Sequence, residues 1–396
     1  MSMCRNVLSA AAYNMYHMYP DSAPPMIDVA VVGGGLAGLS VATQLARAGH
    51  EVVVFEAGSY PRHKLCGEFL SPEAQSSLDR LGVHDALAAH QPPRIDRSVV
   101  TAPGGATDTV SLPAAAWGIS RYVLDALLAE QADAAGATVR TGCRVSDIAG
   151  TLDAGFTVTH AEGHTDARMV VGAWGKHGIP DRTLGRTDLT DTDPVVAFKA
   201  HYEGAMPPVI DIHAFPGGYC GCSPVEAGRF NVCWIGRRDA LQHAGSPEAM
   251  LHAAADANPH LGKRLASGTR CTGFCAVSQV TLDTKGPIHR DVCMVGDTAA
   301  MIAPLCGDGM AMALHAADVL VPHAHRFLSG TQAAATLRTR YATDWHDAFD
   351  TRLQWGRWVH RVAFRPGVAR AVIAGLRLMP SLHRWMFRQT RGPLPA

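Results

Sequence analysis

The stretch IDVAVVGGGLAGLSVATQLARAGHEVVVFEA, residues 27–57, decides the fold of this 396-residue chain. Its apolar run Ile27–Val32 predicts a strand that is buried on both faces. Gly33, Gly35 and Gly38 follow with the spacing G-x-G-x-x-G and open a helix. A strand, a glycine-rich turn, a helix and a second apolar strand in this order predict the first unit of a Rossmann-like α/β domain.

The same stretch predicts a dinucleotide site. In this spacing the first glycine permits the turn, the second lets the backbone approach a pyrophosphate, and the third lets the helix pack on the strand. The start of the helix, which includes Ala37, would offer N–H groups and a positive dipole end to the phosphates. Glu56 follows the strand Glu51–Phe55, 18 residues after Gly38, where a carboxylate accepts hydrogen bonds from a ribose diol. These residues do not separate NAD from FAD.

A second strand–turn–helix unit, DVCMVGDTAAMIAPLCGDGMAMALHAADVL, occupies residues 291–320. It predicts a strand over Val292–Val295, an aspartate at its end, Asp297, and a long helix beginning near Met310. An extended dinucleotide would use both units, with its ribityl hydroxyls on Asp297 and a flavin at the second helix. The N–H groups of that helix would stabilise negative charge on the reduced flavin, which favours FAD.

These segments resemble the FAD-dependent aromatic hydroxylases and geranylgeranyl reductases, and the resemblance covers residues 26 to about 325. It also rests on GISRYVLDALLAEQADAAGATV, residues 118–139, and ARMVVGAWGKHG, residues 167–178. In that family an arginine that opens the helix of the first of these segments contacts FAD, and a backbone group on the next strand meets the adenine. The resemblance implies that these FAD contacts fall at Arg121, Val145, Asp297, Gly309 and Met310.

One departure from the family concerns the electron donor. Hydroxylases of the family carry an Asp-Gly pair where this chain has Trp174-Gly175, and that aspartate is associated with both FAD and NADPH binding. NADPH or NADH is expected as a transient reductant, although no second glycine fingerprint exists for it, as is typical of the family. The alternative is that Trp174 is a packing residue.

The loop PRHKLCGEF, residues 61–69, matches a Pro-…-Cys-Gly motif that lines the flavin in the geranylgeranyl reductase branch. Gly67 would permit close approach of the backbone to the cofactor. Arg62 and Lys64 would stabilise a reduced flavin or guide phosphates, unless the loop is simply solvated. Cys66 is a tentative catalytic residue that would touch the flavin or line the substrate pocket; the alternative is an inert buried thiol. No partner cysteine is near it in the sequence.

Residues 191–285 change to alternating strand patterns and predict an antiparallel substrate domain. This domain would be inserted between the FAD-binding segments 26–190 and 286–330, and part of 83–118 would join it. Halogenases share the fold, but their Trp-x-Trp-x-Ile-Pro signature is absent, so halogenation is the third choice of reaction.

The motif Tyr219-Cys220-Gly221-Cys222-Ser223-Pro224 stands where reductases of the family have Tyr-x-Trp-x-Phe-Pro. Gly221 and Ser223 replace two aromatic residues, which should widen the pocket. Tyr219 is a tentative catalytic residue that would donate a hydrogen bond to substrate, unless the neighbouring glycine pair marks only a hairpin. His213 is either an acid–base group or a structural histidine.

The composition excludes several classes of protein. The formal net charge is 0, so the overall charge gives no reason to expect nucleic-acid binding. The sequence contains no run of eighteen apolar residues, so a membrane span is not expected. The ten cysteines occur singly, which predicts no metal site and a reduced, cytoplasmic protein. Residues 1–25 are expected to form an N-terminal extension.

The C-terminal segment 331–396 is expected to be a helical cap. Nine arginines and no acidic residue follow Asp350, interleaved with apolar residues at helical spacing, and Pro366 and Pro380 should break the segment into short helices. The cap would pack on the FAD domain with its arginines outward; the alternative is peripheral contact with an anionic membrane.

The sequence therefore predicts an α/β protein with a Rossmann-like FAD-binding domain of the glutathione-reductase type, an inserted antiparallel-sheet substrate domain and C-terminal helices. The leading function is an FAD-dependent monooxygenase that hydroxylates an apolar aromatic or polyketide-like small molecule. The alternative is reduction of a carbon–carbon double bond in an isoprenoid-like or polyketide-like substrate. A non-catalytic flavin-binding partner or sensor is the third hypothesis.

Overall fold

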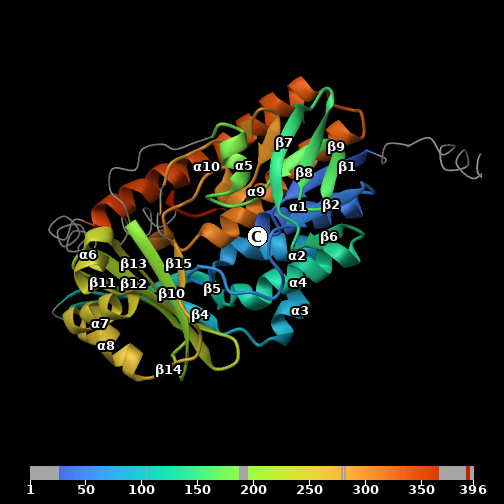
Figure 1. Cartoon of the computed structure of the whole chain (residues 1–396). Helices are drawn as coiled ribbons and strands as arrows, with labels where there is room; N and C mark the ends of the chain where they lie inside the picture. Colours follow the sequence, from blue (N-terminus) through green and yellow to red (C-terminus); the bar gives the residue numbers. More distant parts are fainter. Residues whose placement is uncertain are drawn as a thin grey trace, which may run out of the picture.

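Two sheets with helices packed against them organise the computed structural model of the chain (Figure 1). It describes residues 26–103, 105–186, 195–277, 280, 282–364 and 389–392. The fold is of the α/β class that the sequence predicts. Pro366 and Pro380, and with them the predicted break of the C-terminal helices, lie outside the described residues.

Sheet 1 carries the glycine-rich turn. Its order is β16-β17-β9-β1-β2-β6, and the β7–β8 pair extends from β9. The strands β17, β9, β1, β2 and β6 run parallel. The bounds are β1 Ile27–Val32, β2 Val52–Glu56, β6 Thr138–Thr141, β7 Val145–Thr151, β8 Gly155–His160, β9 Gly163–Gly172, β16 Ile288–His289 and β17 Val292–Met294. Parallel strands place their carboxyl ends at one edge, so the turns after β1, β2 and β17 meet there.

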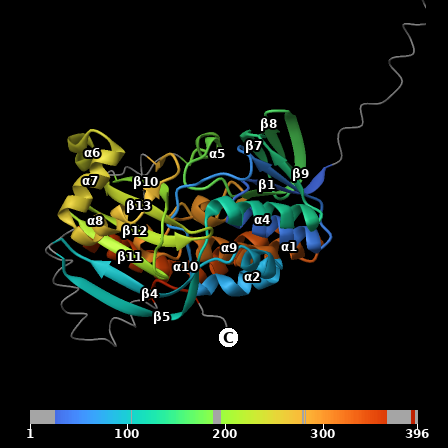
Figure 2. The same cartoon turned by 90° about the horizontal axis from the view of Figure 1, so that it is seen from below.

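Helices α1, α4 and α9 cover one face of sheet 1, and Figure 2 shows them side by side. Their bounds are Leu36–Arg47, Arg121–Ala134 and Gly309–Leu328. The predicted strand at Ile27–Val32 is confirmed, and the predicted helix near Met310 begins one residue earlier. The smaller helices are η1 Pro72–Ala74, α2 Gln75–Leu81, α3 His84–Ala89, α5 Ile179–Thr183, η2 Gly296–Thr298 and η3 Pro304–Cys306.

Two of the three fingerprint glycines are required by close packing. Gly33 has φ +110°, and a Cβ there would lie 2.3 Å from the carbonyl oxygen of Ala173. A Cβ on Gly38 would lie 2.1 Å from the carbonyl oxygen of Gly33. A side chain at Gly33 would collide with the backbone that follows β9, and one at Gly38 would push α1 away from β1.

Sheet 2 forms the second layer, with the order β14-β10-β13-β12-β11-β4-β5-β3 and with β15 paired to β10. Its bounds are β3 Phe69–Leu70, β4 Arg94–Thr101, β5 Thr107–Gly118, β10 Val195–Glu203, β11 Val209–Phe215, β12 Gly218–Val225, β13 Arg229–Arg237, β14 Thr269–Arg270 and β15 Cys275–Val277. The sequence predicts an antiparallel sheet, but one pair differs from that prediction: β4 runs parallel to β11. The pairing is possible since more than a hundred residues separate the two strands, ample for a crossover connection.

The two faces of sheet 2 have different neighbours. Helices α6 Arg238–Ala244, α7 Pro247–Ala257 and α8 Pro259–Ala266 cover one face, against a core that includes Phe198 and Trp234. The other face turns toward sheet 1 and buries Ala197, Tyr219 and Ile235. Successive side chains of a strand point to opposite faces of the sheet, so every second residue of these strands faces the space between the two sheets.

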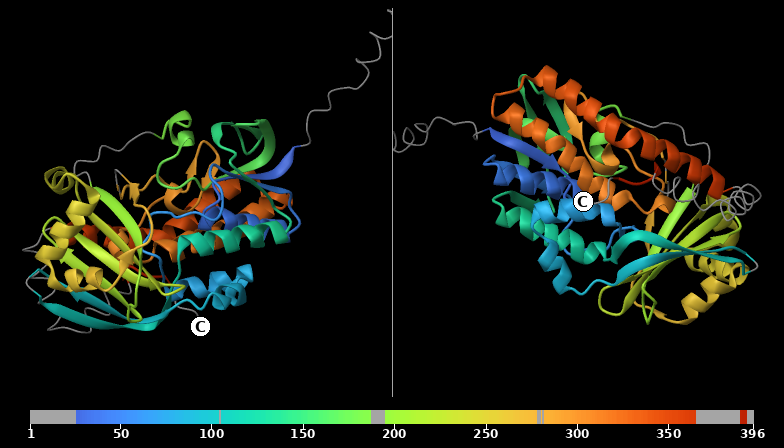
Figure 3. Two further views of the ribbon diagram at one scale, coloured as in Figure 1. Left: turned by 60° about the horizontal axis from the view of Figure 1, so that its bottom comes forward. Right: turned by 180° about the vertical axis from the view of Figure 1, so that it is seen from behind.

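The C-terminal helix α10, Ala334–Ala363, runs alongside α9 in Figure 3. Its buried side chains recur every fourth residue: Leu337, Tyr341, Trp345, Phe349 and Leu353. Tyr341 Oη donates a 2.6 Å hydrogen bond to the carbonyl oxygen of Met294 on β17. The helix is therefore part of the core of the FAD domain.

The arginines of this segment are not all outward. Arg352 is buried, with Nη2 3.3 Å from His315 Nδ1 and Nη1 3.7 Å from Asp308 Oδ2. Arg391 Nη1 approaches Asp308 Oδ1 to 3.9 Å and Glu73 Oε2 to 3.8 Å. Buried carboxylates draw these two guanidinium groups inward. Among the described helices, none is long and apolar enough to cross a membrane.

Replacing Trp345 with alanine tests whether α10 belongs to the core. Trp345 is 1% exposed and packs against Phe349, so its loss should lower the free energy of unfolding by about 3–5 kcal/mol. Gln354→Ala, on the exposed face of the same helix, should change it by less than about 0.5 kcal/mol. Urea unfolding followed by circular dichroism measures both. Equal, small losses would show that α10 is only loosely attached.

Candidate flavin and substrate site

A cavity of about 540 Å³ lies between the carboxyl edge of sheet 1 and the inner face of sheet 2. Its walls come from the turns after β1, β2 and β17, from the Cys66 loop and from β11, β12 and β13. Both halves of the predicted site thus open into one space. The predicted site residues that line it are Gly33, Gly35, Ala37, Glu56, Arg62, Cys66, Gly67, Arg121, Val145, Tyr219, Asp297, Gly309 and Met310. Gly38 does not line it, because it packs against Gly33.

Two cations stand beside the second fingerprint glycine. A Cβ on Gly35 would have Arg121 Nη2 and Lys64 Nζ as its nearest neighbours, both at 3.9 Å. The buried Asp125 holds this pair, at 2.5 Å from Arg121 Nε and 2.7 Å from Lys64 Nζ. Burial alone would raise the pKa of Asp125, but the charges of Arg121 and Lys64 outweigh it and hold that pKa below its ordinary value. Asp125 thus positions both side chains beside Gly35, where a pyrophosphate is expected.

Glu56 is fixed at the end of β2. Its carboxylate accepts hydrogen bonds from the amides of Gly34 at 2.9 Å and Gly58 at 2.7 Å. Arg62 Nη2 donates to the same carboxylate at 2.7 Å. Of the two loop cations, Arg62 therefore lies at the predicted ribose position, and Lys64 is the one beside Gly35.

The second strand–turn–helix unit meets the first directly. Gly296 has φ +58°, and a Cβ there would lie 3.0 Å from Cβ of Ala37 on α1. Asp297 faces the cavity, where burial raises its pKa against the opposing charges of Arg121 and Lys176. The N-termini of α1 and α9 carry no side-chain cap among the described residues, so their N–H groups are open to a ligand. Two open helix ends, paired cations and a carboxylate after β2 fit FAD.

Cys66 is held where it can face a ligand. Its carbonyl oxygen accepts a 2.9 Å hydrogen bond from Asn231 Nδ2 on β13, and its Sγ accepts from the amide of Glu68 at 3.4 Å. Burial raises the pKa of the Cys66 thiol. The sequence shows no cysteine near it, but β13 brings Cys233 to the same cavity, with its pKa raised by burial to about 12. Both groups keep their protons at neutral pH.

Sequence reasoning missed a buried charged cluster at the base of this loop. Glu68 is fully buried and accepts hydrogen bonds from Lys199 Nζ, from His201 Nε2 at 2.5 Å and from the amide of Arg121 at 2.7 Å. Burial alone would raise the pKa of Glu68, but His201 and Lys199 hold it below its ordinary value. The available signal was the pair Lys199 and His201, two residues apart in the otherwise apolar PVVAFKAHY.

The substrate half of the cavity is mostly apolar. Ile210, Ile212 and Ile235 line it, and a Cβ on Gly221 would meet nothing closer than 3.8 Å. Gly221 thus leaves room in the wall of the cavity. Ser223 is buried but is not a cavity residue, so the expected widening comes from Gly221 alone.

Tyr219 presents its hydroxyl to a region with few polar neighbours. Its Oη is buried and has no hydrogen-bond partner of normal geometry among the described residues, although the amide of Leu305 is nearby. Burial raises the pKa of Tyr219 well above its usual value, so the group is a donor. Gly217, with φ +79°, forms the turn into β12. The glycine pair therefore marks a hairpin, and Tyr219 nevertheless lines the cavity.

His213 does not line the cavity. It lies on the opposite face of β11, where its Nδ1 is 2.8 Å from Thr101 Oγ1. Trp174 lines the cavity and also packs tightly, because a Cβ on Gly178 would lie 2.4 Å from its Cδ1. Its indole Nε1 is buried without a partner among the described residues. The packing role of Trp174 therefore does not remove it from the site.

Gly35→Val should abolish FAD retention. The variant should still fold, since no atom lies closer than 3.9 Å to the new Cβ. The valine side chain would, however, occupy the space between Lys64 and Arg121 through which the pyrophosphate approaches the backbone. Flavin absorbance per protein after gel filtration measures the loss. Gly273→Val, in open space on the substrate side, is the matched control. A folded Gly35→Val protein with full flavin would refute the assignment.

Cys66→Ser should keep the fold and FAD but shift the flavin absorption spectrum or reduction potential. Thiol and hydroxyl have similar size but different hydrogen bonding, so a flavin in contact should respond. Cys271→Ser, at an exposed thiol, should leave both unchanged. An unaltered spectrum and potential in Cys66→Ser, with a stability loss of about 1 kcal/mol, would make Cys66 a packing residue.

Comparison with known proteins agrees with this geometry. Residues 26–352 match the FAD binding domain family. The chain is 30% identical over 353 residues to menaquinone reductase of Mycolicibacterium smegmatis, covering 83% of this chain and 80% of that protein. It is 28% identical over 320 residues to ubiquinone hydroxylase UbiL of Rhodospirillum rubrum, covering 76% and 72%.

Solved structures show the same fold at lower sequence identity. The myxobacterial chondrochloren halogenase CndH superposes with a TM-score of 0.73 at 22% identity, over 86% of this chain and 83% of that one. Pseudomonas aeruginosa PqsL in complex with 2-aminobenzoylacetate gives 0.75 at 18%, over 88% and 100%. With the family match spanning most of its length, the chain belongs to the FAD binding domain family and is a flavoprotein oxidoreductase by relationship.

Proposed function

We propose that the chain is an FAD-dependent monooxygenase that hydroxylates an apolar aromatic or quinone-like small molecule, with NADPH or NADH as transient reductant. The observation that carries this is the single cavity joining the FAD-binding turns to the apolar wall of sheet 2. The names of two relatives, a menaquinone reductase and a ubiquinone hydroxylase, support a ring of the quinone type.

The side chains would orient the substrate and exclude water. Ile210, Ile212 and Ile235 would pack against the ring, and Gly221 would leave space for it. Tyr219 Oη, which keeps its proton, would donate a hydrogen bond to a substrate oxygen. When bound, FAD supplies the electron transfer and the activation of oxygen, and the protein supplies position and a water-poor cavity.

Reduction of a carbon–carbon double bond is the second candidate. The Cys66-Gly67 pair lines the cavity, as the resemblance to the geranylgeranyl reductase branch implies, and the relative with 30% identity is a reductase by name. The two reactions differ in mass balance. Hydroxylation consumes O₂ and one reduced nicotinamide, adds one oxygen atom and releases water, whereas reduction adds two hydrogen atoms and needs no O₂.

Single-turnover experiments distinguish the two reactions. The FAD-loaded protein would be reduced anaerobically with NADH or NADPH and then mixed with phenol and naphthol probes that carry a prenyl chain, with ¹⁸O₂ or under argon. We expect a product carrying one ¹⁸O atom, formed only with oxygen. A product with two hydrogens added across the double bond of the prenyl chain under argon would establish the reductase. No turnover and no flavin reduction by either donor across the panel would favour a sensor.

Gly221→Trp tests where the substrate lies. The indole would fill the apolar part of the cavity, so KM should rise by about tenfold or more, equivalent to about 1.4 kcal/mol, while flavin content stays unchanged. Ser223→Ala, buried on the same strand but outside the cavity, is the matched control. An unchanged KM in Gly221→Trp would place the substrate elsewhere.

A further inference from the structure

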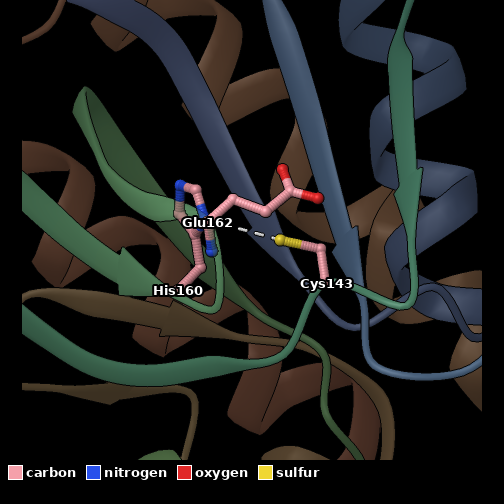
Figure 4. A group of neighbouring side chains, drawn as sticks. All are labelled: Cys143, His160 and Glu162. Carbon is pink, nitrogen blue, oxygen red and sulfur yellow. Dashed lines mark hydrogen bonds between the residues drawn. The ribbon is translucent and has the colours of Figure 1, made fainter.

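Three side chains converge beside sheet 1, outside the cavity: Cys143, His160 and Glu162 (Figure 4). Cys143 lies in the loop between β6 and β7, His160 ends β8, and Glu162 lies in the turn before β9. The sulfur, a ring nitrogen and a carboxylate oxygen all lie within 4.8 Å of one another. Three different ligand types thus come from three separate chain positions.

The spacing of the two buried ligands suits a metal. Cys143 Sγ lies 3.4 Å from His160 Nδ1. Sulfur at about 2.3 Å and nitrogen at about 2.0 Å from one tetrahedral zinc ion lie about 3.5 Å apart. The pair therefore already stands at the separation that a shared ion requires.

The histidine ring is oriented by its surroundings. His160 Nε2 lies 3.0 Å from Thr165 Oγ1, in position to donate to it, which leaves the lone pair on Nδ1 facing the thiol. The ring also packs on Phe55, with the centroids 4.9 Å apart. Metal-binding histidines are fixed in this way, with the second ring nitrogen held by a polar neighbour.

The third ligand provides the entry. Cys143 and His160 are buried, whereas Glu162 is exposed, so an ion can reach the thiol from solvent and keep water as a fourth ligand. Two groups compete for the site: Arg140 Nη1 lies 4.0 Å from Glu162 Oε2, and the amide of Glu162 lies 3.3 Å from His160 Nδ1. The first pair is exposed and weak, and the second bond is long.

We propose that Cys143, His160 and Glu162 bind one zinc ion. A thiolate, an imidazole and a carboxylate are the ligand types that zinc accepts, and they suit it better than magnesium or calcium. This revises the sequence-based expectation of no metal site, because spacings of 17 and 2 residues match no finger pattern. The amide of Cys143 donates to the carbonyl oxygen of Glu56 at 3.0 Å, so the ion would brace the loop that carries Val145 to the cavity.

Equilibrium dialysis of the full-length, FAD-loaded protein against ZnCl₂, after removal of metal with EDTA, tests the proposal. We expect one equivalent of zinc by metal analysis, with the affinity lowered about tenfold or more in Glu162→Gln and further in Cys143→Ser. Glu162→Gln changes an exposed side chain and should not disturb folding. His346→Ala, at an exposed histidine paired with Asp350, should bind zinc as the wild type does.

X-ray absorption at the zinc edge identifies the ligands. The wild type should show one sulfur at about 2.3 Å, and Cys143→Ser should lose it. No stoichiometric zinc would overturn the proposal. Equal affinity in wild type, Glu162→Gln and Cys143→Ser, or loss of zinc in His346→Ala, would also overturn it. In each of these cases any bound zinc would be adventitious, and Cys143 would only be hydrogen-bonded to His160.

Discussion

The buried carboxylate of Glu68 has to be paired, and its partners tie the two sheets together. An ionised carboxylate without solvent costs several kcal/mol unless charges and hydrogen bonds compensate it. From β10 of sheet 2, Lys199 supplies the opposite charge and His201 a hydrogen bond, and the amide of Arg121 supplies a further hydrogen bond from α4. Because Glu68 follows Cys66-Gly67, the same pairing sets the position of the loop between the FAD-binding turns and the substrate wall.

Much of the fold was predictable because local sequence and tertiary packing agree there. Gly33 and Gly38 lie where a Cβ would overlap a backbone oxygen. The glycine spacing in the sequence therefore reflects a packing requirement of the fold itself. The parallel pairing of β4 with β11 was not predictable, since strand patterns report burial and carry no information about partner or direction.

The residues of the site likewise include some that the sequence predicts and some that only the structure reveals. Gly35, Glu56 and Asp297 follow from strand ends and a known spacing, and all three reach the cavity. Glu68, Lys199 and Cys233 could not be assigned from spacing, because residues more than a hundred positions apart come together only through sheet 2. The Arg62–Glu56 pair likewise needed coordinates, since sequence does not tell which of two neighbouring cations turns toward a carboxylate.

Burial then decides what the cavity groups can do. It keeps the hydroxyl of Tyr219 and the thiols of Cys66 and Cys233 protonated, so on the substrate half these groups act as hydrogen-bond donors or apolar contacts rather than bases. Glu68 is ionised but already accepts from Lys199 and His201, which lowers its basicity. A site with these properties positions a substrate firmly and moves few protons itself. That division suits chemistry carried out by a bound flavin, with selectivity set by the shape that Gly221 and the isoleucines leave open.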